Sequence, residues 1–100
     1  MAKSWEEILA SIREAVLNEH YVLTPHAWQE MREDDLTLPD IETALLRGRI
    51  DREYENDPRG VRYRVAGPAS DLLSPVGVIL RFVDDDRILI ITVYVIENHP

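Results

Sequence analysis

The first part of the chain places its apolar residues with the spacing of an α-helix. From Trp5 onward they recur three or four positions apart, which puts them on one helix face. Ser4 and Glu7 stand at the spacing of a capping box, in which a hydroxyl and a carboxylate satisfy the first free N–H groups. This pattern predicts a helix over residues 5–18 with one buried face.

Two further helices are predicted in the first half of the chain. Thr24 is a suitable N-cap for the second helix, which ends in the charged cluster of residues 32–35. Thr37 begins the third helix, and Gly48 follows it at the position where a left-handed C-cap is expected. A short β-prone run, residues 20–23, separates the first two helices.

The apolar period then changes from that of a helix to two. Residues 50–54 and 61–65 alternate apolar and charged positions around a turn signal at 56–60, which predicts a β-hairpin with one solvated face. Residues 76–83 and 87–96 predict two more strands. The last is apolar on both faces and is expected to be central and covered. The predicted fold class is α+β, with N-terminal helices on a mainly antiparallel sheet of about four strands.

Composition narrows the class of protein. The 100 residues fit a single domain, in which residues 1–19 are an added N-terminal helix and residues 21–96 form the core. The chain contains no cysteine, so disulfides, thiolate metal sites and cysteine nucleophiles are excluded. The longest near-apolar run, residues 88–96, is shorter than a membrane-spanning helix requires, and residues 1–14 lack a signal-peptide core. We therefore expect a cytoplasmic protein with no membrane partner.

Charge is distributed unevenly along the chain. The sequence has 19 Asp and Glu against 11 Lys and Arg, a net charge of −8. Tight binding of nucleic acid comes largely from basic residues that neutralise phosphates, so this balance argues against DNA and against non-specific RNA binding. Residues 47–64 are the exception. Their arginines are Arg47, Arg49, Arg52, Arg59, Arg62 and Arg64. Either they form a solvated strand face paired with neighbouring acids, or they form a local strip that binds a partner.

His26 is the histidine whose surroundings suggest chemistry. It lies in the first turn of the second predicted helix, four positions before Glu30, so the two side chains share a face. Such a pair suits acid–base catalysis or two ligands of a metal, but a surface pair is the simpler interpretation. No metal and no cofactor is expected. His20 is assigned a structural role, and His99 stands next to the C-terminus.

Known catalytic motifs are missing from the sequence. It has no glycine-rich phosphate loop and no nucleophile elbow. The acids at 84–86 indicate a polar turn, since the remaining positions of a calcium-binding loop are absent. Tyr94, in the last predicted strand, is either a structural tyrosine or a hydrogen-bonding group for a substrate.

A set of spaced motifs points to a family. It includes Thr24-Pro-His-Ala27, the cluster of residues 31–37 and the ending Thr92-Val-Tyr94. Through these motifs residues 21–96 resemble a small bacterial domain of unknown function, number 4258. At longer range this domain is similar to toxins of the RelE and BrnT type, small α+β proteins that cleave RNA, often at the ribosome.

The resemblance implies a groove on the sheet that holds basic and acid–base side chains. The residues at the corresponding positions are His26, Arg62, Tyr63 and Tyr94. The chain departs from the common family pattern at three places. Glu30 and Asp34 stand where arginine is frequent, and Gly77 stands where histidine is frequent, so phosphate contacts and one acid–base group are lost.

Two functions follow from these observations. The favoured one is a non-catalytic interaction module that binds a protein partner or a second copy of the chain. The alternative is a toxin-type endoribonuclease in which His26, Arg62 and Tyr94 are catalytic and RNA is the partner. The candidate binding residues are Glu30, Arg47, Arg52, Tyr63 and Arg64. Arginines that converge with His26 or Tyr94 on one face would favour the enzyme, and neutralisation of those arginines by acids would favour the module.

Overall fold

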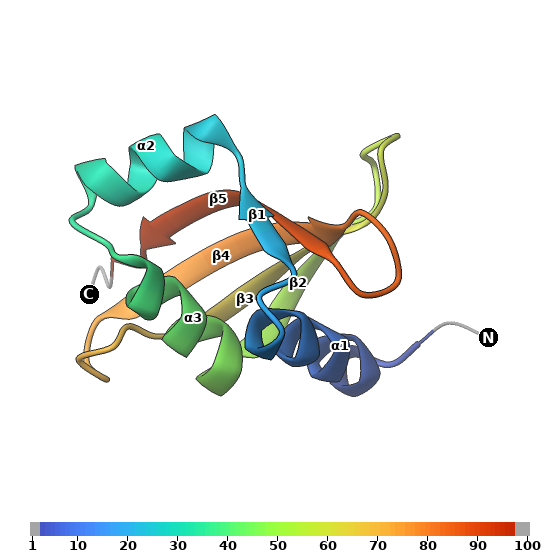
Figure 1. Ribbon diagram of the computed structural model, residues 1–100, viewed down its shortest axis with the longest axis horizontal. Helices are drawn as coiled ribbons and strands as arrows, with labels where there is room; N and C mark the ends of the chain where they lie inside the picture. The colour runs from blue at the N-terminus through green and yellow to red at the C-terminus, as the bar shows by residue number, and fades with distance from the viewer. Residues whose placement is uncertain (1–2, 98–100) are drawn as a thin grey trace.

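The computed structural model, which describes residues 3–97, consists of three helices and one five-stranded sheet (Figure 1). The helices are α1 (Trp5–Leu17), α2 (Pro25–Glu33) and α3 (Leu38–Arg47). The strands are β1 (Tyr21–Leu23), β2 (Arg49–Tyr54), β3 (Arg62–Pro68), β4 (Pro75–Phe82) and β5 (Ile88–Val95). Their order in the sheet is β1-β5-β4-β3-β2. The α+β class is confirmed, and His99 lies outside the described residues.

The sheet has one strand more than the sequence pattern predicted. The β-prone run after α1 forms β1, which pairs in parallel with the first half of β5, Tyr21 opposite Ile88 and Leu23 opposite Ile90. The other neighbouring strands are antiparallel. A run of three residues carries too little periodicity to identify a strand, and its pairing partner lies far away in the sequence.

The N-caps of α1 and α2 form as their sequences predict. The Ser4 hydroxyl accepts a hydrogen bond from the Glu7 N–H at 3.2 Å, and the Glu7 carboxylate accepts from the Ser4 N–H. In α2 the Thr24 hydroxyl accepts from the Ala27 N–H at 3.0 Å. These bonds satisfy N–H groups that have no partner inside the helix, so each helix begins where its capping residue stands.

Gly48 does not adopt the predicted left-handed C-cap. Its φ of −85° and ψ of −171° are extended. A Cβ atom at this position would lie 2.4 Å from the carbonyl oxygens of both Ala44 and Ala66. At Gly67 on β3, a Cβ atom would meet the same Ala44 oxygen at 2.4 Å. Both glycines are therefore required because α3 and the sheet approach each other at backbone distance.

The hydrophobic core lies mainly between the sheet and two of the helices, and α2 adds Ala27 and Met31 to it. Figure 1 shows α1 and α3 against one face of the sheet. The fully buried side chains include Ile12, Ile41, Leu45, Val65, Val78, Leu80, Ile90 and Val93. Arg13 ties α1 to the end of α3, because its guanidinium donates a hydrogen bond of 2.8 Å to the Gly48 carbonyl.

The remaining helix, α2, runs along the edge of β5 beyond the end of β1 (Figure 1). The Glu30 carboxylate accepts a hydrogen bond from the Val93 N–H at 3.2 Å, and the Asp34 carboxylate accepts from the Val95 N–H at 3.0 Å. The Thr24 hydroxyl donates to the Ile91 carbonyl at 3.1 Å. Side chains of α2 thus occupy hydrogen-bonding groups that a further strand would otherwise use.

The expectation that the last strand is covered on both faces is wrong. Ile88, Ile90 and Val93 of β5 are buried under the helices. Thr92 and Tyr94 point to the opposite face and are half-buried. Among the described residues no helix covers that face. Only the first half of the strand is interior to the sheet, between β1 and β4, and its second face is closed only by neighbouring side chains.

Candidate nucleic-acid interface

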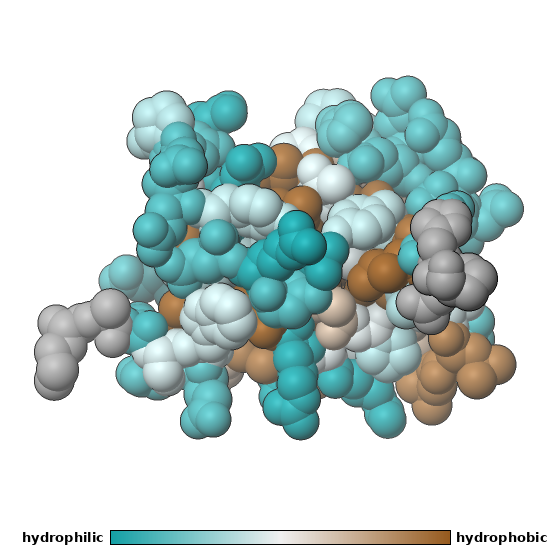
Figure 2. Space-filling model, turned by 180° about the vertical axis from the view of Figure 1, so that it is seen from behind, coloured by the Kyte–Doolittle hydropathy of each residue, from teal (hydrophilic) through white to brown (hydrophobic). Residues whose placement is uncertain are grey.

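The sheet face opposite α1 and α3 carries a concentration of arginines. Strand register places Arg52, Arg62, Arg64 and Arg81 on it, together with Tyr54 and Tyr94. We call this surface the arginine face. Figure 2 shows the molecule from this side, where hydrophilic side chains cross a paler surface that contains brown patches. The face combines cations, aromatic rings and some aliphatic surface.

The arginines stand opposite one another in the strand pairing. Arg62 on β3 lies across from Arg81 on β4, and Arg52 on β2 lies across from Arg64 on β3. Like charges in directly opposite positions destabilise a sheet by roughly a few tenths of a kcal/mol per pair. Such an arrangement is accommodated best by an anion that lies between the guanidinium groups.

Arg64 is the most tightly held of these side chains. Its Nε and Nη2 atoms donate hydrogen bonds of 2.7 and 2.5 Å to the two carboxylate oxygens of Asp51. Its Nη1 atom donates to the Tyr94 hydroxyl at 2.9 Å. The hydrogen bond from Arg64 holds the pKa of Asp51 below its usual value, and the same contact raises the pKa of Arg64. Arg64 is therefore a fixed positive charge beside the Tyr94 hydroxyl.

A β-bulge brings Arg52 to the arginine face. The pairing of β2 with β3 shifts between Ile50 and Arg52. Ile50 is buried in the core, and Asp51, by simple alternation, reaches Arg64 on the opposite face. Alternation would return Arg52 to the core side, but the shift pairs it with Arg64 on the arginine face. Bulges redirect side chains in this way because one extra residue is inserted into the strand.

The Tyr94 ring occupies space that is available only because Gly77 has no side chain. A Cβ atom at Gly77 would lie 2.6 Å from the Cζ atom of Tyr94. The ring therefore lies against the backbone of β4, over the residue with which Tyr94 is paired. The space above Gly77 is thus filled by the ring of Tyr94.

Arg62 has two different neighbours. Its guanidinium lies 5.5 Å from the centroid of the Tyr54 ring, a cation–π distance. Its Nε atom lies 3.5 Å from a carboxylate oxygen of Asp57. Hydrogen bonding from the Arg59 backbone N–H is the main cause that lowers the pKa of Asp57. In the described part of the chain, Arg52 and Arg81 have no carboxylate at ion-pair distance.

The other candidate residues lie elsewhere. His26 is on α2, where its Nε2 atom lies 3.3 Å from the carboxylate of Glu30, and 66% of its side chain is exposed. Arg47 is at the end of α3, and Tyr63 lies on the helix side of the sheet beside Phe82. Among the predicted residues, the structure brings together Arg52, Arg62, Arg64 and Tyr94.

Three residues of the arginine face were not predicted as site residues. These are Asp51, Tyr54 and Arg81. Asp51 was not singled out because its two hydrogen bonds to Arg64 depend on the pairing of β2 with β3. Arg81 was missed because it joins the face only through its pairing with Arg62. The alternation of residues 76–83 is the one sequence signal that could have placed Arg81 on the face of the sheet opposite the buried residues.

The described residues contain neither a metal centre nor a membrane span. No group of three or more His, Cys, Asp or Glu side chains within residues 3–97 is placed to hold a metal ion. None of the helices in that range is long and apolar enough to cross a bilayer.

Comparison with known families gives one assignment. The chain belongs to the family described as Domain of unknown function (DUF4258), whose model matches residues 23–95. The matched segment contains the whole arginine face and excludes α1. No curated protein and no solved structure matches the chain. The longer-range similarity to RelE- and BrnT-type toxins stays a prediction.

Proposed function

We propose that the arginine face binds single-stranded RNA and that the protein cleaves it as an endoribonuclease of the toxin type. The observation that carries this proposal is the register that pairs Arg62 with Arg81 and Arg52 with Arg64 across neighbouring strands, on a face that no described helix covers. Guanidinium groups bind phosphate oxygens through two parallel hydrogen bonds. A phosphodiester backbone laid along the face would relieve the repulsion within both pairs.

The shape and chemistry of the face favour single-stranded RNA over a duplex. Sheets that bind single strands combine cations for the backbone with aromatic rings on which bases stack. Tyr54 and Tyr94 supply such rings from β2 and β5. The rest of the chain is acidic, with a net charge of −8, so contacts are limited to the strand that lies on the face itself.

The arrangement around Arg64 suits cleavage by attack of a ribose 2′-hydroxyl on the adjacent phosphate. Negative charge grows on the phosphate oxygens in the transition state, and fixed guanidinium groups stabilise it there. The 2′ oxygen forms its bond to phosphorus as the bond to the 5′ oxygen breaks, and the 2′-hydroxyl proton passes to solvent water. The Tyr94 hydroxyl gives its proton to the departing 5′ oxygen, with Arg64 stabilising the phenolate that remains until solvent returns a proton to it. Asp51 is a weak base because its pKa is lowered. The mechanism we infer therefore relies on charge stabilisation more than on proton removal.

A protein-interaction module is the second candidate. Asp51 and Asp57 already pair with Arg64 and Arg62, which reduces the positive potential available to RNA. The loop between β3 and β4 also exposes Leu72 and Leu73, the latter to 85%. In this alternative the face and loop bind a protein partner or a second copy of the chain.

A binding measurement tests the first candidate. The purified protein is titrated against a short fluorescein-labelled single-stranded RNA at several salt concentrations. We expect R62A/R81A to weaken binding and to lower the salt dependence by about two phosphate contacts. R47A is the matched control, since Arg47 is an exposed arginine off the face. If R62A/R81A and R47A bind the RNA equally well, the proposal that the arginine face binds RNA is wrong.

Expression in bacteria tests the cleavage step. We expect induced wild-type protein to arrest growth and fragment RNA, and Y94F to relieve both while it still binds RNA. Y94F retains the ring over Gly77 and removes only the hydroxyl. Intact RNA and normal growth with soluble wild-type protein would leave the interaction module as the function.

A further inference from the structure

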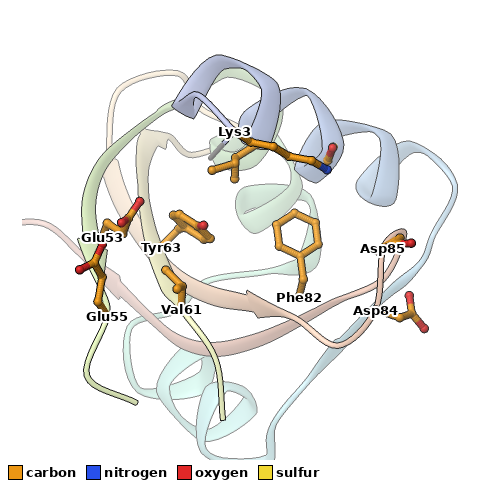
Figure 3. Close-up of a pocket in the computed structure, with 10 residues that line it drawn as sticks. Lys3, Glu53, Glu55, Val61, Tyr63, Phe82, Asp84 and Asp85 are labelled. Atoms are coloured by element: carbon orange, nitrogen blue, oxygen red, sulfur yellow. The ribbon is translucent and has the colours of Figure 1, made fainter. Parts of the chain in front are cut away.

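A cavity of about 420 Å³ opens on the helix side of the sheet, between the start of α1 and the ends of β2, β3 and β4 (Figure 3). It lies on the opposite side of the sheet from the arginine face. Tyr63 and Phe82 form its floor, and Ile8 of α1 contributes apolar surface from above. Its volume falls in the range of small-molecule sites, which are mostly apolar with a few polar groups.

The floor of the cavity consists of two half-buried aromatic rings. The centroids of Tyr63 and Phe82 are 6.5 Å apart and their planes meet at 77°. The Tyr63 hydroxyl makes no hydrogen bond to any described residue. Burial is the main cause that raises the pKa of Tyr63, and Glu53 and Glu55 add to it. Aromatic faces attract cations, and more strongly where water is displaced.

Two pairs of carboxylates stand on opposite sides of the aromatic floor. Figure 3 shows Glu53 and Glu55 on one side and Asp84 and Asp85 on the other. Lys3 is the only basic residue among those that line the cavity. The rim is therefore acidic around an apolar centre, a combination complementary to a positive group on an apolar stem.

The Glu53–Glu55 pair is itself arranged for positive charge. Interaction with Glu55 is the main cause that lowers the pKa of Glu53, and the same interaction raises the pKa of Glu55. The Trp5 indole donates a hydrogen bond of 3.0 Å to Glu53. A cationic ligand beside the pair would favour the charged form of both carboxylates.

We propose that this cavity binds an organic cation, an alkylammonium or guanidinium group carried on an apolar stem. The stem would lie on Tyr63 and Phe82, and the charged end would reach either acidic pair. Such a group occurs in free polyamines and in the basic side chains of a protein partner. The inference does not depend on RNA binding, because it concerns other residues on the other side of the sheet.

Trp5 supplies a reporter at the cavity. In a W28F background it is the remaining tryptophan, and its indole is bonded to Glu53. We titrate this protein with spermidine and, separately, with N-acetyl-arginine amide, and follow the emission of Trp5. We expect saturable binding of at least one probe. Spermidine alone would identify a free amine as the ligand, and the arginine derivative would identify a basic side chain; either result supports the proposal.

Matched variants separate the cavity from general attraction to an acidic protein. E55Q/D85N should weaken binding about tenfold, since one negative charge is lost from each acidic pair on the rim. V61K, which places a competing cation at the mouth of the cavity, should abolish it. E33Q changes an exposed acid on α2 and should leave affinity unchanged, as should R62A/R81A.

Two results would overturn the proposal. One is the absence of saturable binding by both probes to folded W28F protein. The other is equal weakening by E33Q and by E55Q/D85N, or equal displacement by magnesium ions, because attraction to net charge alone would then account for binding. Loss of RNA binding in R62A/R81A, measured in the same preparations, bears only on the function proposed for the arginine face.

Discussion

The two faces of the sheet are built from the same strands but contribute differently to the stability of the fold. On β4, Val78 and Leu80 are completely buried against the helices. Ile79 and Arg81, next to them in sequence, lie half-buried on the arginine face. Alternation along a strand allows one face to supply most of the folding free energy. The other face can then hold opposed positive charges that do not help the fold.

The largest difference between the faces should appear in the free energy of unfolding. Truncation of a buried leucine loses transfer energy and leaves a cavity, so L80A should destabilise by about 3 kcal/mol. I79A, on the arginine face, should cost roughly 1 kcal/mol, because only part of that side chain is buried. Urea unfolding followed by circular dichroism measures both. Equal losses would show that the arginine face is packed as firmly as the core.

A smaller loss should follow from filling the space under Tyr94. G77A places a methyl group 2.6 Å from the Tyr94 ring, so the ring must move and its hydrogen bond to Arg64 is broken. We expect destabilisation of about 2 kcal/mol, the range found for overpacking. In a Y94A background the same substitution should cost much less. A double-mutant cycle by urea unfolding tests this coupling, and additive losses would contradict it.

On the helix side of the sheet, the free energy of unfolding should depend on pH through Asp40. Asp40 at the start of α3 binds Ser70 of the β3–β4 loop, and the Ser70 hydroxyl is the main cause that lowers the pKa of Asp40 to about 2. A lowered pKa stabilises the fold above the unfolded value of 3.8, and this contribution is lost as pH falls through about 2.

The variant D40N isolates that contribution. We expect it to destabilise the protein at neutral pH by about 1 kcal/mol, a figure reduced for solvent screening. The difference from wild type should shrink below pH of about 4 and vanish near the lowered pKa. Unfolding curves at a series of pH values measure it. A difference that stays constant over this range would show that Asp40 acts without its charge.

The smallest effect should have the opposite sign. R81T removes one member of the Arg62–Arg81 pair, so the repulsion is lost and a residue with high strand propensity is gained. We expect a gain of about 0.5 kcal/mol in stability together with weaker RNA binding. Urea unfolding and the RNA titration report the two quantities. A loss of stability would mean that Arg81 contributes to the fold, and the argument from opposed charges would fail.

The local elements could be predicted from the sequence because their signals are local. The cap residues Ser4 and Thr24 fix where α1 and α2 begin, and both form the expected hydrogen bonds. The alternation of residues 61–65 predicted a strand that the structure contains as part of β3, which begins at Arg62. Each of these signals acts over a few residues, where propensity and hydrogen bonding decide the outcome.

The features that depend on pairing between distant segments could not be predicted from local sequence patterns. β1 exists because β5 offers it a parallel partner. Gly48 is extended because α3 and β3 approach closely, and no local pattern shows such an approach. Arg81 belongs to the candidate site because of its register with Arg62. Burial and pairing between remote segments determine all three.

The acids of α2 have a consequence for self-association. Glu30 and Asp34 occupy the amide groups of the second half of β5, and β1, which pairs with the first half, is only three residues long. A further chain could therefore add lengthwise only at β2, the other outer strand. Two copies that pair through β2 use the one available edge of each sheet, so strand addition stops at a dimer. The fold therefore resists templated growth into fibrils even at high protein concentration.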